Sequence, residues 1–161
     1  MEPENIEILI EKIRLLMPSS GLWPVTVIST NKDELKGLSC EPHILAEHQL
    51  LFLRRTDFNI TDLVDYLSNT VDFLTIPVDN KANYLDFYTQ KINNKSDLIN
   101  WSGKIASLSI GLAIGLSEHL DLCISPIEAN LTELDEHFQF DNRNLKAHQL
   151  FEIYTCSHCK H

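Results

Sequence analysis

The segment from Trp101 to Glu128 constrains the fold more than any other part of the sequence. Between Ile105 and Leu116 it is apolar apart from two serines and two glycines, so apolar side chains surround most of a helix built on it. Such a helix cannot keep one face in water and must be covered by the rest of the fold or by a second subunit. The run is shorter than the roughly 20 residues that a membrane-spanning helix needs. We therefore predict a core or interface helix over residues 97–119 that leads directly into a strand.

The composition is typical of one globular domain, which we expect to span residues 1–161. The chain has 23 acidic and 13 basic residues and a formal net charge of −10. This charge opposes contact with nucleic acid or with anionic membranes, so we expect neither as a partner. Small anionic ligands remain possible wherever a few cations meet. The acidic N-terminus lacks the pattern of a secretory signal, which favours a cytoplasmic protein with reduced cysteines.

Hydrophobic patterning predicts four short strands and several helices. The strands fall at residues 24–29, 49–54, 121–125 and 150–155, where β-branched or apolar residues cluster in short runs. Apolar residues at helical spacing predict a first helix over residues 4–16, in addition to the helix over 97–119. This order of elements indicates an α+β or α/β fold.

Capping residues predict three further helix starts. Asn31 can cap a short helix that ends at Gly37, and either Asp57 or Asn59 can open a helix that continues to about residue 74. Thr132 begins a Thr-x-x-Asp pattern that is typical of a helix N-terminus.

Two stretches resemble the FMN-dependent nitroreductase family. The first is PSSGLWPVTVISTNKDELKGL, at residues 18–38, in which a Pro-Ser-Ser loop leads into a strand. The second is the segment 101–128, and its most specific part is Pro126-Ile127-Glu128 at the end of a strand. Within that segment the resemblance also rests on several single positions, which are Trp101, Lys104, Leu108, Gly111, Leu120 and Leu122. The order and spacing of the two stretches agree with the family, so the likeness covers nearly the whole chain.

The resemblance implies an α+β fold with a central mixed or antiparallel sheet of about four strands flanked by helices. It also implies a homodimer formed through the helix at 97–119, with FMN in the dimer cleft and NAD(P)H as the electron donor to a small acceptor. The cofactor-binding residues that it implies are Pro18, Ser19, Ser20, Pro126, Ile127 and Glu128. The backbone amide of Glu128 would donate to the flavin N5 and stabilise negative charge on the ring. Because the flavin carries the chemistry, no catalytic side chain is expected.

The sequence also departs from the family. Residues 1–161 have no counterpart of the Arg and Ser motif that holds the FMN phosphate, nor of the family's basic C-terminal arm, and Asp121 and Ala129 replace glycines. Basic residues that could replace the phosphate contacts show no convergent spacing; they are Lys12, Arg14, Lys36, Lys104 and Lys146. The alternative is therefore a degenerate nitroreductase-fold protein without catalysis, which acts as a binding or interaction module.

Two other features carry chemistry. Cys156 and Cys159 form a Cys-x-x-Cys motif followed by a histidine, which suggests a thiol- or zinc-responsive tail, but no second ligand pair is present and we assign no metal site. The pair Arg54-Arg55 at a strand end could bind an anion or simply lie at a solvated edge. The sequence does not distinguish NADH from NADPH, nor does it identify the acceptor.

Overall fold

The computed structural model describes residues 3–15, 25–40, 46–57, 59, 61–62, 64–65, 80, 83, 86 and 95–155. Its centre is a four-stranded sheet in the order β1-β2-β4-β3, and every neighbouring pair is antiparallel. The strands are β1 (Val25–Asn31), β2 (His48–Arg55), β3 (Leu122–Ile127) and β4 (Leu145–Thr155). Each overlaps one of the four predicted strands, and the α+β class is confirmed.

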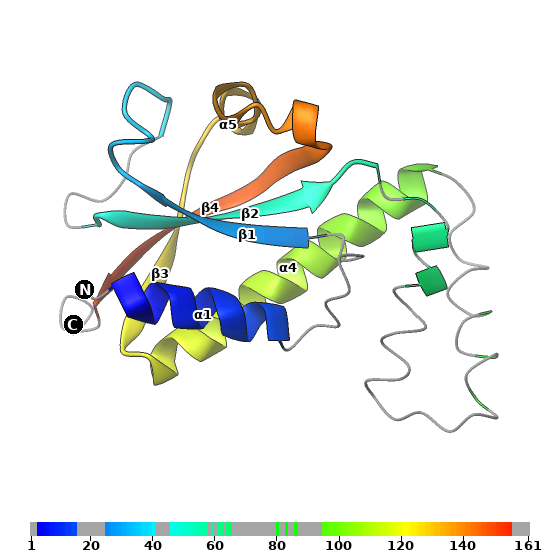
Figure 1. Ribbon diagram of the computed structural model, residues 1–161, viewed down its shortest axis with the longest axis horizontal. Coiled ribbons are helices and arrows are strands. Elements are labelled where there is room, and N and C mark those ends of the chain that lie inside the picture. The colour runs from blue at the N-terminus through cyan, green and yellow to red at the C-terminus, as the bar shows by residue number, and fades with distance from the viewer. Residues whose placement is uncertain are drawn as a thin grey trace.

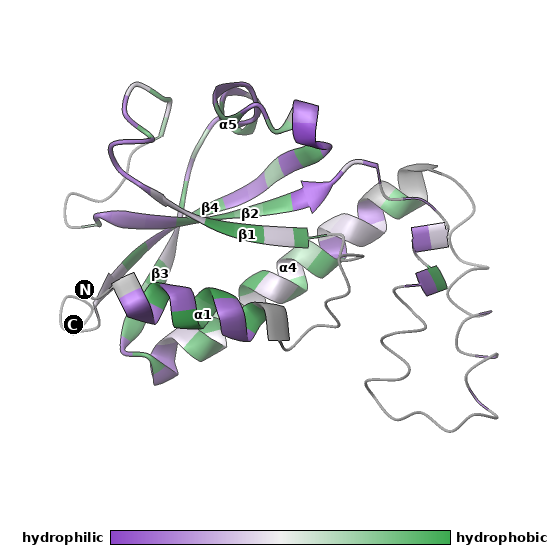
Figure 2. Cartoon of the chain, in the orientation of Figure 1, coloured by the Kyte–Doolittle hydropathy of each residue, from purple (hydrophilic) through white to green (hydrophobic). Residues whose placement is uncertain are grey.

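Helices cover both faces of the sheet (Figure 1). Helices α1 (Pro3–Leu15) and α4 (Lys95–His119) lie on one face, and α5 (Leu131–Phe138) lies on the other with the loop that follows β1. The central strand β2 is therefore apolar on both sides, and its residues Leu50–Leu53 are at most 1% exposed. Figure 2 shows the resulting hydrophobic middle of β2 between hydrophilic ends. Leu50 and Phe52 belong to the core under α1 and α4, whereas Leu51 and Leu53 belong to the core under α5.

The long helix α4 confirms the element predicted over 97–119, and it buries an unusual face. Its buried side chains are mostly small or hydroxylated, namely Leu98, Ser102, Ala106, Ser109, Ala113 and Ser117. Small side chains let the helix approach the sheet closely, and the Ser109 and Ser117 hydroxyls donate to the carbonyls of Ile105 (2.9 Å) and Ile114 (2.7 Å). The opposite face leaves Leu108 61% exposed and Ile114 47% exposed. In the part of the chain that the structure describes, the sheet therefore covers one side of α4, and the side with Leu108 and Ile114 is exposed.

The loop after β1 corrects one prediction. Residues 32–37 form hydrogen-bonded turns and no helix, although Asn31 Oδ1 accepts the amide of Glu34 at 2.9 Å as a capping residue would. A segment this short gains too few hydrogen bonds to offset the cost of helix nucleation. Gly37 ends the turns with φ of 88°, in the left-handed region that glycine favours. Asp121, at the end of α4, adopts φ of 53°, as expected for an aspartate that replaces glycine.

Helix α5 begins earlier than predicted. Asn130, and not Thr132, is its N-cap, since Asn130 Oδ1 accepts the amide of Glu133 at 3.2 Å. Further along α5, the buried Asp135 carboxylate accepts the backbone amide of Ala147 at 2.6 Å, which ties the helix to β4.

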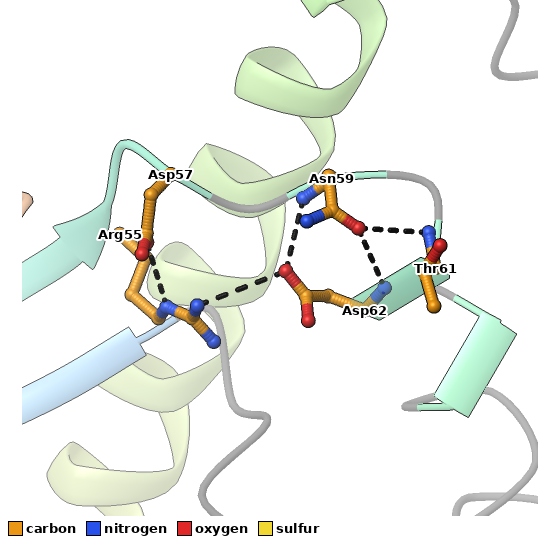
Figure 3. A network of polar contacts seen from close by, with 5 residues as sticks. All are labelled: Arg55, Asp57, Asn59, Thr61 and Asp62. Carbon is orange, nitrogen blue, oxygen red and sulfur yellow. Dashed lines mark hydrogen bonds and ion pairs between the residues drawn. The ribbon is translucent and has the colours of Figure 1, made fainter.

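A polar network fixes the chain after β2 (Figure 3). Asn59 Oδ1 accepts the amides of Thr61 (2.9 Å) and Asp62 (3.0 Å), and the Asn59 amide donates back to Asp62 Oδ2 at 3.1 Å. This reciprocal capping box identifies Asn59, rather than Asp57, as the predicted helix start. Arg55 joins it by ion pairs with Asp57 (3.0 Å) and Asp62 (3.7 Å). Most of the helix predicted to follow, up to residue 74, lies outside the described residues.

Candidate functional site: a groove at the end of the edge strand

A groove of about 1370 Å³ opens where β3 ends and the chain turns into α5. Four parts of the chain meet there: residues 38–40, the end of β3, the start of α5 and the middle of β4. The groove-lining residues are Leu38, Ser39, Cys40, Pro126, Ile127, Glu128, Ala129, Leu131, Gln149 and Glu152.

Backbone contacts hold one wall of the groove in place. Cys40 and Ala129 form an isolated antiparallel bridge, and the Asn130 amide donates to the Ser39 carbonyl at 3.2 Å. The Ser39 amide donates in turn to Glu133 Oε2 at 3.0 Å. Residues 38–40 are thereby attached to the N-terminal turn of α5, and the groove has a preformed wall.

The end of β3 forms the other wall. Strand β3 is at the edge of the sheet, where Pro126 is tolerated because an outward-facing position needs no N–H for the ladder. Ile127 is buried and Glu128 is exposed. Gln149 Nε2 donates to the carbonyls of Ile127 (3.4 Å) and Leu150 (3.2 Å), which fixes the strand end against β4.

The structure thus brings together three of the six residues that the resemblance singles out. Pro126, Ile127 and Glu128 all line the groove. Pro18, Ser19 and Ser20 lie outside the described residues.

The groove is apolar to acidic in character. Its two ionisable carboxyl groups belong to Glu128 and Glu152, and no lysine or arginine is among its described lining residues. The thiol of Cys40 is free, and burial, followed by the negative charge of Glu133, raises the pKa of that thiol. A thiol with a raised pKa stays protonated near neutral pH and is a poor nucleophile. The groove therefore offers a platform and polar backbone groups rather than a reactive side chain.

These features fit one part of FMN and not the other. Pro126, Ile127 and Leu131 offer an apolar surface suited to a flat ring, and Gln149 adds an amide. A phosphate monoester, however, carries about two negative charges and requires cations beside it. The described lining of the groove supplies none.

The cations considered as replacements for the phosphate contacts do not converge on the groove. Lys12, Lys36 and Lys146 are exposed, and Lys104 lines a different hollow beside α4. The side chain of Arg14 is outside the part that the structure describes. None of the four described lysines Lys12, Lys36, Lys104 and Lys146 lines the groove.

Cys156 and Cys159 of the predicted cysteine-rich tail lie outside the described residues. Within the described ranges no group of three or more His, Cys, Asp or Glu side chains could hold a metal ion. Cys123, on β3, is disulfide-bonded, which departs from the reduced state expected for the chain.

Of the helices in the part of the chain that the structure describes, none has the length and hydrophobicity that a bilayer crossing requires.

Comparison with known proteins identifies the fold. No family model matches the sequence, and no characterised protein matches it by sequence. Solved structures do match. A nitroreductase-like protein from Streptococcus mutans superposes with a TM-score of 0.67 at 12% identity over 96% of this chain and 78% of its own. The fold is nitroreductase-like.

Two further structures agree with this assignment. A protein from Exiguobacterium sibiricum, assigned as a nitroreductase and crystallised with FMN, matches with a TM-score of 0.66 at 13% identity over 96% of this chain and 78% of its own. A protein from Staphylococcus epidermidis assigned as an NAD(P)H:FMN oxidoreductase matches with a TM-score of 0.64 at 15% identity over 96% of this chain and 77% of its own. At these identities the likeness establishes the nitroreductase-like fold that the sequence resemblance implied.

Most of the groove was not predicted, since only Pro126, Ile127 and Glu128 of its described lining residues were expected to bind the cofactor. Residues 38–40 reach it only through the bridge to Ala129, a contact that local patterning does not reveal. Gln149 and Glu152 gave a signal that could have been used, because they are polar residues inside an otherwise apolar strand.

Proposed function

We propose that this protein is a flavin-dependent oxidoreductase of the nitroreductase type, which passes electrons from NAD(P)H through FMN to a small acceptor. The observation that carries the proposal is the position of Pro126, Ile127 and Glu128 along a groove of about 1370 Å³ in a nitroreductase-like fold. Three neighbours with this fold are described as nitroreductases or as an NAD(P)H:FMN oxidoreductase, one of them in complex with FMN. The need for reduced nicotinamide favours the cytoplasm as its location.

In this proposal the protein binds and orients the ring. Pro126 and Ile127 supply the apolar platform, and the backbone N–H of Glu128 is the donor that the resemblance assigns to the ring. Gln149 keeps the end of β3 in position through its bond to the Ile127 carbonyl. Bound flavin would supply the hydride chemistry, so the side chains need not include a general acid or base. The protonated thiol of Cys40 would leave the ring unmodified.

We also propose that the protein acts as a homodimer through α4. The exposed face of the helix carries Leu108 and Ile114, and the neighbouring Gly111 and Gly115 have open space where a Cβ would lie. An exposed apolar stripe with small residues at its centre suits close packing against a second helix, and a second copy presents the same stripe.

The second candidate function is a binding or interaction module without catalysis. The observation that favours it is the charge of the groove, since Glu128 and Glu152 line it and no described lining residue is basic. Such a groove would repel the FMN phosphate and accept an uncharged or cationic ligand instead.

Flavin binding separates the two functions. For the enzyme, the purified protein should show flavin absorption that a reduced nicotinamide bleaches, and FMN at about 100 times its Kd should stabilise the native state by about 2.7 kcal/mol. Two substitutions of Glu128 test the role of its backbone amide. Glu128→Pro removes the backbone donor and should weaken FMN binding, whereas Glu128→Ala keeps that donor and should bind as the wild type does. A protein that stays colourless and gains no thermal stability from excess FMN would exclude the enzyme and favour the binding module.

A further inference from the structure

The pair Arg54-Arg55 contains two arginines in opposite electrostatic situations. Arg55 is neutralised by Asp57 and Asp62, at 3.0 and 3.7 Å (Figure 3). Arg54 is half-buried and points to the other face of the sheet, toward α4, where no carboxylate in the described residues pairs with it. A half-buried guanidinium without a counter-ion is costly, so its surroundings need an explanation.

Other basic groups gather around Arg54. In the β2–β4 ladder Lys146 stands directly opposite Arg54, which places their Cβ atoms about 5 Å apart. His148 is next to them: a methyl group at Gly103 would lie 3.7 Å from Arg54 Nη1 and 4.0 Å from His148 Cε1. Both side chains therefore lie against α4 beside Gly103.

A β-bulge aims His148 at this place. Phe52 pairs with Gln149 and Leu53 with Ala147, so His148 is the extra residue of β4. Bulges redirect side chains and are frequent next to functional sites. Here the bulge directs His148 toward Ser107 of α4, whose Oγ lies 3.5 Å from His148 Nε2.

His148, Gly103 and Ser107 line a hollow of about 730 Å³ on the α4 side of the sheet, and the Arg54 side chain lies beside it at Gly103. Its lining residues are Asn100, Gly103, Lys104, Ser107, Leu108 and His148. Asn100, Gly103, Lys104 and Ser107 follow helical spacing on one face of α4, and Lys104 is exposed and unpaired among the described residues. The hollow lies N-terminal to Gly111 and Gly115, at which we propose that two copies of α4 meet.

An anion bound beside this cluster would reduce the repulsion between its positive charges. Like charges placed directly opposite in a sheet are destabilising, as for Arg54 and Lys146. Burial, and then the charge of Arg54, lowers the pKa of His148. In the described residues no carboxylate forms an ion pair with Arg54, Lys104 or Lys146, which are permanent cations.

We propose that Arg54, Lys104 and His148, with Ser107, form a binding site for the phosphate group of a small phosphorylated molecule. Arginine and lysine supply charge-assisted donors, and the hydroxyl of Ser107 and the amide of Asn100 add neutral ones. The site is open on one side, so the rest of the ligand can extend from the hollow. The proposed phosphate site does not depend on FMN binding in the groove at the end of β3. The phosphate site and the proposed flavin-dependent function can therefore be tested independently of each other.

Calorimetric titration with inorganic phosphate tests the site, at pH 7 and at an ionic strength held constant with chloride. The wild type should bind phosphate saturably with one site per chain, and Arg54→Gln and Lys104→Gln should each weaken binding by about tenfold. Lys32→Gln is the matched control, because Lys32 follows β1 at the opposite end of the sheet, where Asn31 pairs with His48. It loses the same charge and should bind as the wild type does.

The stability of the variants adds a second readout. Without phosphate, Arg54→Gln should be at least as stable as the wild type because it removes a like-charge contact, and circular dichroism confirms that the variants are folded. If Arg54→Gln did not fold, Lys104→Gln, at an exposed position, would still decide. Absence of saturable binding in the wild type would overturn the proposal, and so would equal weakening in Lys32→Gln, which would reveal a general charge effect.

A comparison of FMN with riboflavin distinguishes the sources of the phosphate. If the wild type prefers FMN and Lys104→Gln loses that preference, the site takes the flavin phosphate. If Lys104→Gln loses inorganic phosphate binding but keeps the preference for FMN, the site holds the phosphate of a different small molecule.

Discussion

Replacement of Leu108 by glutamate should separate the proposed dimer into folded monomers. Leu108 lies on the exposed face of α4, where it is 61% exposed in the single chain. Little of its side chain contributes to the core of its own subunit. The substitution should therefore act on association and leave the fold of each subunit intact.

The exposed fraction gives the magnitude. Complete burial of a leucine side chain contributes about 1.5–3 kcal/mol, so the part of Leu108 that is still exposed could add about 1–2 kcal/mol for each copy. A two-fold contact uses the same residue twice, which gives about 2–4 kcal/mol for the dimer. This corresponds to a dimer Kd raised roughly 30- to 900-fold, and desolvation of the new carboxylate would raise it further.

Sedimentation velocity over a concentration series measures this change. The matched control is Leu131→Glu, because Leu131 is also an exposed leucine, at 39%, but it starts α5 on the other face of the sheet. The control should dimerise like the wild type, and Leu108→Glu should sediment as a monomer with an unchanged circular dichroism spectrum. A wild type that is monomeric at all concentrations, or an equal dimer Kd for Leu108→Glu, would refute the proposed role of α4.

Three smaller predictions concern single contacts. Asp135→Ala leaves the buried Ala147 amide without its acceptor and should cost about 1–3 kcal/mol in urea unfolding, whereas Asp135→Asn retains an acceptor and should cost less. Asn130→Ala removes the α5 cap and should cost about 1 kcal/mol in the same assay, but Thr132→Ala should cost little, and the reverse order would contradict the cap assignment. Since the pKa of His148 is lowered from 6.5 in the folded state, the unfolded chain binds that proton first as pH falls, and stability should drop below about pH 6.5. His148→Asn should reduce this loss in thermal unfolding measured from pH 7.5 to 5, and an unchanged pH profile would contradict the assignment.

The parts of the fold that the sequence predicts are those that depend on local pattern. The apolar run Leu50–Leu53 reads as a strand buried on both faces, and helix α4 is recognisable from the density of its apolar residues. The orientation of α4 was not predictable in the same way. Its buried side uses serine and alanine while Leu108 is exposed, so the usual assignment of apolar residues to the core fails for this helix.

Prediction fails where a contact joins distant parts of the chain. Pro126, Ile127 and Glu128 are found through resemblance, but Ser39 and Cys40 enter the groove through pairing with residues about 90 positions later. The Asn31 cap was read correctly and the helix behind it was not, since the cap signal says nothing of how many turns follow. Local sequence therefore identifies one wall of the groove and leaves the other undetected.

Two neighbouring residues of β4 contribute to two hollows that differ in charge. His148 lines the basic hollow beside α4, and the next residue, Gln149, lines the acidic groove at the end of β3. Successive side chains of a strand point to opposite faces, and the bulge at His148 interrupts this alternation locally. One strand therefore contributes both to a platform for a ring and to a cluster of cations. A ligand that carries both an aromatic ring and a phosphate needs these two environments, and this chain separates them over one peptide bond.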